Sequence, residues 1–260
     1  MSDAQQQRIA ALEAELAGLR TEMQDYTYTV SHDLRAPLRH ILSYAQLAQE
    51  EAGPLLPEES RGFLRTISES AQHMGSLLDG LTELSRLGTS TVQCAPVPLH
   101  ALLQDVMADV VLPYPGRNVQ WTVPPHAPEV LADATLLRRA LHCVLDNALK
   151  FTAQRSVAHI SISIEVQAAA DGNCNPLVML SIQDNGAGFN PAMQERLFKP
   201  FQRLHTTRQF PGIGMGLALT HKIAQRLNGT VTIEGTPDAG CRVQLSLPVA
   251  AAATSDLLQG

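Results

Sequence analysis

A histidine and an aspartate stand side by side in the stretch S-H-D-L-R-A-P-L-R, which runs from Ser31 to Arg39. A neutral imidazole is a nucleophile, so His32 is a candidate for covalent chemistry. At about 100° per residue around a helix, His32 lies about 160° from both Val30 and Leu34, and its ring is therefore predicted to point into water. The alternative is an ordinary surface histidine.

Two further polar residues with chemical uses lie in L-D-N-A-L-K-F-T, at positions 145–152. Asn147 and Lys150 are three residues apart and therefore share one helical face. The amide oxygen suits a hard cation, and the ammonium suits a phosphate group. A solvated polar face is the alternative, and this segment taken alone favours it.

The stretch D-N-G-A-G-F, at positions 184–189, follows a strand-like run. Gly186 and Gly188 would let the backbone pass close to a ligand, because neither carries a side chain. An anchored carboxylate such as Asp184 can accept a hydrogen bond from an exocyclic amine, for example that of adenine. A tight turn after a strand is the alternative explanation.

A second glycine-rich stretch, P-G-I-G-M-G-L-A-L at positions 211–219, leads into a predicted helix. Its three alternating glycines are Gly212, Gly214 and Gly216. Exposed amides at a helix amino terminus bind phosphate. The preceding residues, 203–210, are numerous and polar enough to form a mobile lid.

The elements that must position these residues begin with a long helix. Apolar residues recur at alternating steps of three and four, which is the seam of a coiled coil and calls for a partner helix. They are Ile9, Leu12, Leu16, Leu19, Met23, Tyr26 and Val30. Around Leu34 the spacing lengthens to eleven residues, which relaxes the supercoil, and Pro37 is expected to bend the helix.

A second helix is predicted from about Glu58, after the breaker A-G-P-L-L-P at positions 52–57. Its apolar residues also follow three-four spacing: Leu64, Ile67, Ala71, Met74, Leu78 and Leu81. A lone helical hairpin has only one covered apolar face. Two chains are therefore expected to pair as a four-helix bundle, which makes a homodimer.

The remainder of the chain alternates short strands and helices, which predicts an α+β sandwich with a sheet covered by helices on one face. Strands are expected at 119–123, 160–166, 177–182, 231–234 and 243–247, and helices at 99–111, 134–150 and 216–227. Residues 168–176 are predicted to form a surface hairpin loop. The predicted divisions are a coiled-coil extension (1–25), the helical hairpin (26–88), the sandwich (92–248) and a disordered tail (249–260).

Composition limits the classes of partner and compartment. The chain has 260 residues, is 45% hydrophobic and carries a formal net charge of -6, so two domains are expected and nucleic acid or an anionic membrane is not. No apolar run approaches the ~18 residues that span a bilayer, and no signal core begins the chain, so a cytoplasmic protein is expected. Four scattered cysteines (Cys94, Cys143, Cys174 and Cys241) fit reduced thiols.

The order of these motifs carries more weight than any one of them. An S-H-D-L-R-x-P helix is followed by the asparagine helix, then D-x-G-x-G, then F-K-P-F at 198–201, then G-x-G-x-G. This order closely resembles the kinase core of sensor histidine kinases of two-component systems, over residues 26–248. The wording of S-H-D-L-R-A-P-L-R and F-Q-R-L-H looks most like the phytochrome-type branch.

The resemblance implies a dimerisation and phosphoacceptor hairpin joined to an ATP-binding domain of the Bergerat (GHKL) type. His32 would be the phosphoacceptor, with Asp33 as its hydrogen-bond partner and general base. The enzyme would be an ATP-dependent protein histidine kinase that passes its phosphoryl group to an aspartate of a response-regulator receiver domain, docked on the bundle near His32. Only 25 residues precede Tyr26, so a signal would arrive through a separate sensor protein or through the coiled coil.

By the same resemblance, Asp184 would recognise the adenine amine and Asn147 would hold Mg²⁺ against the phosphates of ATP. Gly186 and Gly188 would give the nucleotide room, and Gly212, Gly214 and Gly216 would hinge the lid. Lys150 and Arg203 would neutralise the charge of the triphosphate. Phe198 and Phe201 are expected to pack in the core at the base of the lid.

Two positions depart from the family pattern. Cys143 stands where the family usually has a second asparagine, one helical turn before the magnesium ligand, so the autokinase rate is expected to suffer. Ala36 replaces a threonine or asparagine that orients water, so weak or absent phosphatase activity is expected. The alternatives are a non-catalytic ATP-binding scaffold that regulates another kinase, and a conformational ATPase, although such ATPases lack the S-H-D-L-R helix.

Overall fold

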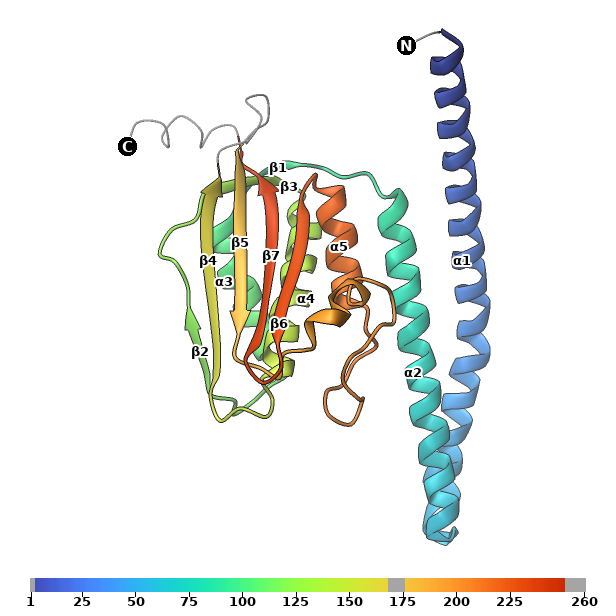
Figure 1. Cartoon of the computed structure of the whole chain (residues 1–260). Coiled ribbons are helices and arrows are strands. Elements are labelled where there is room, and N and C mark those ends of the chain that lie inside the picture. The colour runs from blue at the N-terminus through green and yellow to red at the C-terminus, as the bar shows by residue number, and fades with distance from the viewer. Residues whose placement is uncertain (1–2, 168–175, 251–260) are drawn as a thin grey trace. The chain divides into compact units, whose positions relative to one another are not determined.

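The computed structural model describes residues 3–167 and 176–250. The chain divides into two compact units, Met1–Ser90 and Thr91–Gly260. The first unit is helical and the second contains both sheet and helices, as the sequence predicts. Each unit is described here by itself (Figure 1).

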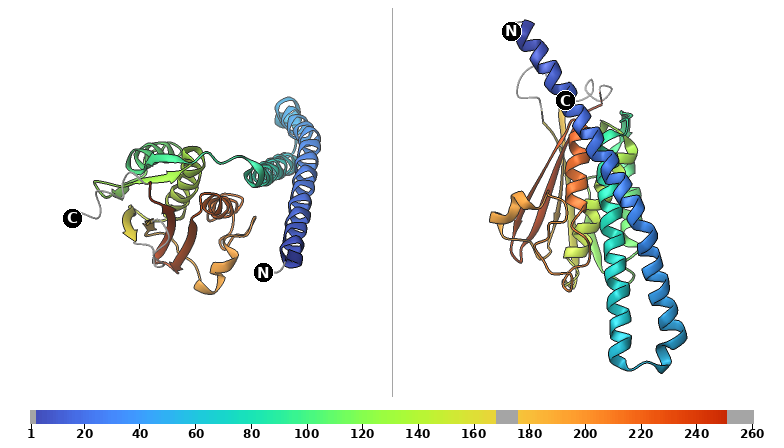
Figure 2. Two further views of the ribbon diagram at one scale, coloured as in Figure 1. Left: turned by 90° about the horizontal axis from the view of Figure 1, so that it is seen from above. Right: turned by 90° about the vertical axis from the view of Figure 1, so that its right-hand side faces the viewer.

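The first unit is a helical hairpin. It consists of α1 (Asp3–Ala52), the short 3₁₀ helix η1 (Gly53–Leu55) and α2 (Glu58–Thr89). The two long helices run side by side from the turn that joins them (Figure 2, right). Proline is one reason for the break, because Pro54 is the second residue of η1 and Pro57 precedes α2. By contrast, α1 continues through Pro37 as one helix.

Helix α1 is much longer than α2, so among the described residues of the first unit its amino-terminal part extends past the end of α2. The Gln24 side chain already lies level with the end of α2, where its Nε2 donates to the Ser85 carbonyl oxygen at 3.4 Å. The predicted seam residues before this point are exposed: Ile9, Leu12, Leu16, Leu19 and Met23. This exposure agrees with the expectation that the segment needs a second helix to cover it.

The second unit is built on a five-stranded sheet with the order β2-β4-β5-β7-β6. The strands are β2 (Val119–Thr122), β4 (Ala158–Gln167), β5 (Leu177–Asp184), β6 (Thr230–Thr236) and β7 (Gly240–Pro248). The β2–β4 pair is parallel and the other pairs are antiparallel. The last residue of β5 therefore lies beside the beginning of β7, where Asp184 pairs with Cys241.

Three helices cover one face of this sheet, as Figures 1 and 2 show: α3 (Leu99–Val111), α4 (Ala134–Phe151) and α5 (Gly216–Arg226). Their apolar faces supply most of the largest fully buried side chains. The largest fully buried side chains include Leu99, Leu103, Leu137, Leu141, Leu145, Leu149 and Ile223 from the helices, and Ile160, Leu180 and Leu247 from the strands. This layering confirms the predicted α+β sandwich.

Three short elements escaped the sequence prediction. Strands β1 (Ala95–Pro98) and β3 (Glu129–Ala132) form a separate antiparallel pair, and a 3₁₀ helix, η2 (Pro191–Arg196), follows the D-N-G-A-G-F stretch. The two strands pair from Ala95 opposite Ala132 to Pro98 opposite Glu129.

The predicted disordered tail is wrong for its first two residues. Val249 and Ala250 are both buried, and the Ala250 N–H donates to the Glu129 carbonyl oxygen at 3.0 Å. Val249 also bridges to Val130, so the ordered chain continues past β7 against β3. The rest of the predicted tail, and the predicted hairpin loop up to residue 175, lie outside the described residues.

Within the described parts of the chain, no helix is long and apolar enough to cross a membrane. Cys94, Cys143 and Cys241 are free thiols, and Cys174 falls outside the described residues.

Candidate functional site

His32 lies on α1 with its side chain 68% exposed, and the side chain of Asp33 is 71% exposed. The predicted outward orientation of the ring is therefore confirmed. The His32 Nδ1 lies 3.2 Å from Asp33 Oδ1. A carboxylate without its proton can only accept a hydrogen bond, so in a neutral imidazole this contact favours the proton on Nδ1 and the lone pair on Nε2. A neutral ring held in this way would have Nε2 free to act as a nucleophile.

One aromatic side chain of α1 lies against the His32 ring. The ring of Tyr28, one turn earlier, stacks on it with centroids 6.4 Å apart. The guanidinium of Arg86, from the last turn of α2, lies 5.8 Å from the Tyr28 ring centroid. Ser31, which directly precedes His32, is fully buried. The helix therefore turns the serine inward and the histidine outward.

In the second unit, α4 presents Asn147 and Lys150 on one face, as their spacing predicts. The Lys150 Nζ donates to Asn147 Oδ1 at 2.7 Å. Burial lowers the pKa of Lys150, the Asp146 carboxylate opposes this effect, and Arg203 lowers the pKa further. The ammonium also lies 4.7 Å from the centroid of the Phe151 ring. This cation is therefore partly desolvated and would interact strongly with an anion.

Asp184 ends β5 with only 8% of its surface exposed. Burial raises the pKa of its carboxyl to about 6, although hydrogen bonds from the backbone of Gly186 and Cys241 act in the opposite direction. The Gly186 N–H donates to Asp184 Oδ1 at 2.7 Å. A buried carboxylate that is fixed by backbone donors is well suited to accept a hydrogen bond from an exocyclic amine.

Neighbouring protein atoms explain why positions 186 and 188 are occupied by glycine. A side chain at Gly186 would begin 2.7 Å from both Asp184 Oδ1 and the Phe151 carbonyl oxygen. Gly188 has a φ of 59°, and a Cβ there would collide with the Thr236 carbonyl group. Close approach of backbone to backbone thus excludes a side chain at both positions.

The third predicted motif starts α5 and lies against the polar face of α4. A Cβ built at Gly212, which has a φ of 127°, would lie 3.5 Å from Lys150 Nζ. A Cβ at Gly216 would lie 3.5 Å from Asn147 Nδ2 and 3.6 Å from the Cys143 Cβ. Gly214 packs against the Gln202 carbonyl. The structure therefore brings the two predicted motifs together.

The predicted lid, residues 203–210, and the glycine-rich stretch that follows it fold back on each other and contact α4. The Arg203 guanidinium donates to the carbonyl oxygens of Phe210, at 2.6 Å, and Gly212. Phe151, His205 and Phe210 form a cluster of rings with centroids 5.0 to 5.6 Å apart. The His205 Nε2 lies 2.9 Å from the Gly188 carbonyl oxygen, so the lid contacts the D-N-G-A-G-F stretch. The sequence prediction missed this cluster.

The two phenylalanines of F-K-P-F differ from each other. Phe198 is half-buried and its ring lies 5.2 Å from that of His221 on α5. Phe201 has a φ of 62° and is 38% exposed. The prediction that both belong to the core is wrong for Phe201, which supports the lid by its backbone, since its N–H donates to the Gly214 carbonyl oxygen at 3.0 Å.

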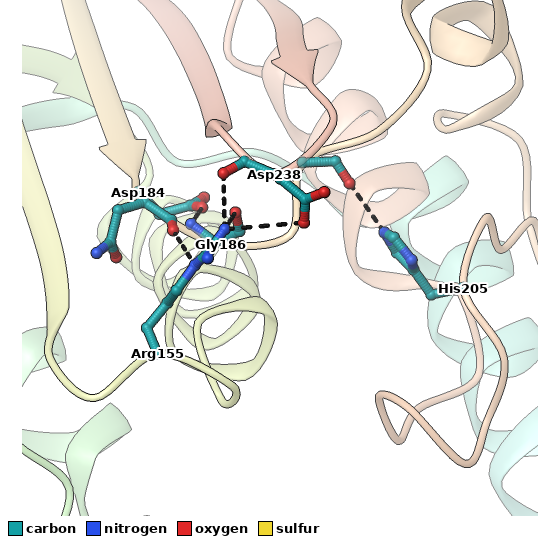
Figure 3. A network of polar contacts seen from close by, with 7 residues as sticks. Arg155, Asp184, Gly186, His205 and Asp238 are labelled. Carbon is teal, nitrogen blue, oxygen red and sulfur yellow. Dashed lines mark hydrogen bonds and ion pairs between the residues drawn. The ribbon is translucent and has the colours of Figure 1, made fainter.

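Arg155 is a further residue of the site that the sequence prediction missed. Figure 3 shows its guanidinium between the Asp184–Gly186 segment and the β6–β7 turn. It donates to the carbonyl oxygens of Asn185 at 2.8 Å, Gly186 at 3.0 Å and Asp238 at 2.7 Å. The figure also shows His205, with its hydrogen bond to the backbone on the other side of the segment.

Side chains that could bind Mg²⁺ directly are few at any one place among the described residues. No group of three or more His, Cys, Asp or Glu side chains among the described residues could hold a metal ion. Mg²⁺ is usually bound by one or two protein oxygens together with phosphates and water. The Asn147 Oδ1 accepts from Lys150 and has a second lone pair, so this amide oxygen fits as one ligand of a nucleotide-bound ion.

Comparisons with known proteins agree with these two units. The family model of the His Kinase A (phospho-acceptor) domain matches residues 22–90. The model of the histidine kinase-, DNA gyrase B- and HSP90-like ATPase matches residues 132–251. The fold and the site thus define the class, an ATPase domain joined to a helical phosphoacceptor domain.

Individual relatives match most of the chain. The phytochrome-like protein Cph1 of Synechocystis sp. is 27% identical over 245 residues, 94% of this chain and 32% of that protein. The cell-division control histidine kinase PdhS of Brucella suis is 25% identical over 259 residues, 91% of this chain and 24% of that protein. A crystal structure of full-length ShkA in complex with AMPPNP has a TM-score of 0.61 at 29% identity and covers 88% of this chain and 47% of that chain.

Together, the two models and these relatives show that the chain carries the kinase core of the sensor histidine kinases. It spans about a third or less of the length of the curated relatives.

Proposed function

We propose that this chain is an ATP-dependent protein histidine kinase that phosphorylates itself on His32. The observation that carries the proposal is the imidazole of His32, whose side chain is 68% exposed and whose Nδ1 lies 3.2 Å from Asp33 Oδ1. The Nε2 lone pair attacks the γ-phosphorus of ATP, the bond from that phosphorus to the bridging oxygen breaks, and ADP leaves. Asp33 holds the Nδ1 proton as the ring gains positive charge.

The second unit binds the nucleotide in this proposal. Asp184 accepts from the adenine amine, and the cations of Lys150 and Arg203 screen the charge of the triphosphate. Asn147 is a ligand of Mg²⁺, which supplies further charge screening when bound. Positioning and charge screening are what phosphoryl transfer chiefly requires. The support is the buried carboxylate of Asp184 and the meeting of the glycine-rich lid with Asn147 and Lys150.

The hairpin pairs with that of a second copy to form a homodimer, and it donates the phosphoryl group to a second protein. The uncovered stripe of α1, which includes Leu16 and Met23, supports pairing with a second copy. Phosphohistidine then passes its phosphoryl group to an aspartate of a response-regulator receiver domain. The nitrogen–phosphorus bond breaks, an acyl phosphate forms, and the imidazole is restored. A separate sensor protein supplies the signal in this proposal.

The test is incubation of the purified chain with ATP labelled on the γ-phosphate. Label that is labile in acid and stable in alkali is expected on the wild type and absent from His32→Gln. His40→Gln is the matched control, since His40 is also an exposed histidine of α1, and it should retain the label. Asp33→Asn should slow labelling without abolishing ATP binding. Equal labelling of His32→Gln and the wild type would refute the proposal.

A second candidate function is a non-catalytic ATP-binding scaffold. It is favoured by Cys143, a buried thiol one helical turn before Asn147, at a position facing the start of α5. A thiol is a poor partner for magnesium and phosphate. Nucleotide binding without any label would support this candidate, and steady release of free phosphate that does not depend on His32 would indicate a conformational ATPase.

A further inference from the structure

Arg155 connects two backbone segments that are far apart in the sequence. Its Nε donates to Asn185 O at 2.8 Å, and its Nη2 donates to Gly186 O at 3.0 Å and to Asp238 O at 2.7 Å. The side chain is 35% exposed, and the Asp238 carboxylate is 4.0 Å away and almost fully exposed. The guanidinium therefore acts mainly through three carbonyl oxygens.

One of these bonds leads directly to the carboxylate of Asp184. The carbonyl of Asn185 and the N–H of Gly186 belong to the same peptide group, which is planar. Arg155 binds the oxygen of this group, and the N–H donates to Asp184 Oδ1 at 2.7 Å. In a trans peptide the two groups point in opposite directions, so the plane lies between the guanidinium and the carboxylate. A rotation of this plane would turn the donor away from Asp184.

The other two bonds resist that rotation. The Gly186 carbonyl belongs to the next peptide group, so Arg155 holds two successive planes. The bond to Asp238 joins them to the β6–β7 turn, where the Asp238 N–H donates to Ala187 O at 2.8 Å. A guanidinium has several donors in a rigid planar arrangement, whereas an ammonium is a single point charge. Arginine is therefore suited to hold three carbonyls at once.

We propose that Arg155 is a positioning residue for adenine recognition, and that it orients the Asp184 carboxylate through the Asn185–Gly186 peptide plane. The inference rests on the proposed binding of ATP, and it names a residue that determines the specificity of this binding for adenine. Arg155 itself touches no substrate. Its loss is expected to weaken the hydrogen bond that an exocyclic amine donates to Asp184 more than the contacts with the phosphates.

The experiment compares ATP with purine riboside triphosphate, which has the same phosphates but lacks the exocyclic amine. Calorimetric titration of the full chain with each nucleotide gives a preference ratio. A charge-assisted hydrogen bond predicts that the wild type prefers ATP by roughly tenfold to a hundredfold. Arg155→Met is expected to reduce this ratio about tenfold, mainly by weakening ATP binding. The KM for ATP should rise while kcat at saturating ATP stays within about twofold.

Arg138→Met is the matched control. It removes a guanidinium of the same unit that pairs with Asp105 and Asp109 on α3, and it should leave the preference ratio unchanged. Arg155→Lys should recover part of the ratio, because the ammonium can replace some of the bonds. Should Arg155→Met fail to fold, Arg155→Lys decides the question, since a wild-type ratio in that variant refutes the planar-donor argument.

The outcomes separate this inference from the proposed function. The role of Arg155 alone is overturned if the wild type prefers ATP to purine riboside triphosphate and a folded Arg155→Met shows the same preference. A wild type that binds both nucleotides equally overturns the role of Asp184 on which the inference rests. Hydrogen exchange of the Gly186 amide in the nucleotide-free chain gives an independent readout. It should be faster in Arg155→Met than in Arg138→Met, and equal rates would contradict the proposed orientation of the peptide plane.

Discussion

Asp184 is expected to lower the stability of the nucleotide-free protein at neutral pH. Burial raises its pKa from the ordinary 3.8 to about 6. The stability that a raised pKa contributes is fully present below pH 3.8 and is lost as the pH rises through about 6. A difference of about 2 in pKa corresponds to about 3 kcal/mol. Asp184→Asn is neutral at every pH, so it should be more stable than the wild type by at most about 3 kcal/mol at pH 7.

Urea unfolding measured by tryptophan fluorescence tests this expectation. The chain has a single tryptophan, Trp121, which lies on β2 in the same unit as Asp184. The stability advantage of Asp184→Asn should be largest at pH 7 and should vanish near pH 4. Asp105→Asn, at an exposed carboxylate in an ion pair, should change stability by less than about 1 kcal/mol. A variant that is less stable than the wild type at pH 7, or an advantage that does not depend on pH, would refute the reasoning.

Two further predictions concern Gly188 and His205, whose Nε2 lies 2.9 Å from the Gly188 carbonyl oxygen. Gly188→Ala should destabilise the second unit by about 3 kcal/mol or more in urea unfolding, because the new Cβ collides with backbone at a positive φ. Gly116→Ala, also at a positive φ but in open space, should cost only about 1 kcal/mol, and equal losses would contradict the collision. His205→Ala should release the lid, so that trypsin cuts after the exposed Arg208 several times faster than in the wild type. Unchanged cleavage would show that the ring cluster does not hold the lid.

The helices were predictable because their signals are local. Leu99–Val111 matches α3 at both ends, and α4 begins at the predicted Ala134, after the cap Asp133. Apolar periodicity and capping residues fix such ends within one or two turns. Strands β1 and β3 are only four residues long, and β1 contains two prolines. Their pairing joins residues more than thirty positions apart, so no short stretch of sequence reveals it.

The same distinction separates the predicted from the missed parts of the site. Asn147 and Lys150 were placed together from their spacing, because residues three apart on a helix are neighbours. Arg155 and His205 act on backbone carbonyl oxygens of distant residues. Every residue has such an oxygen, so the sequence carries no mark of which one is bound. Only the fold reveals that these side chains belong to the site.

Glycines mark where a side chain is excluded, but the sequence does not say what excludes it. Gly188 and Gly212 both have a positive φ, and both stand in motifs that look alike as patterns. At Gly188 the excluding group is the backbone of Thr236, whereas at Gly212 the nearest atom is the ammonium of Lys150. Backbone cannot move aside easily, whereas a lysine side chain can. Gly188 is therefore required for folding. Gly212 lies beside the Lys150 ammonium, which would face the negative charge of a bound phosphate.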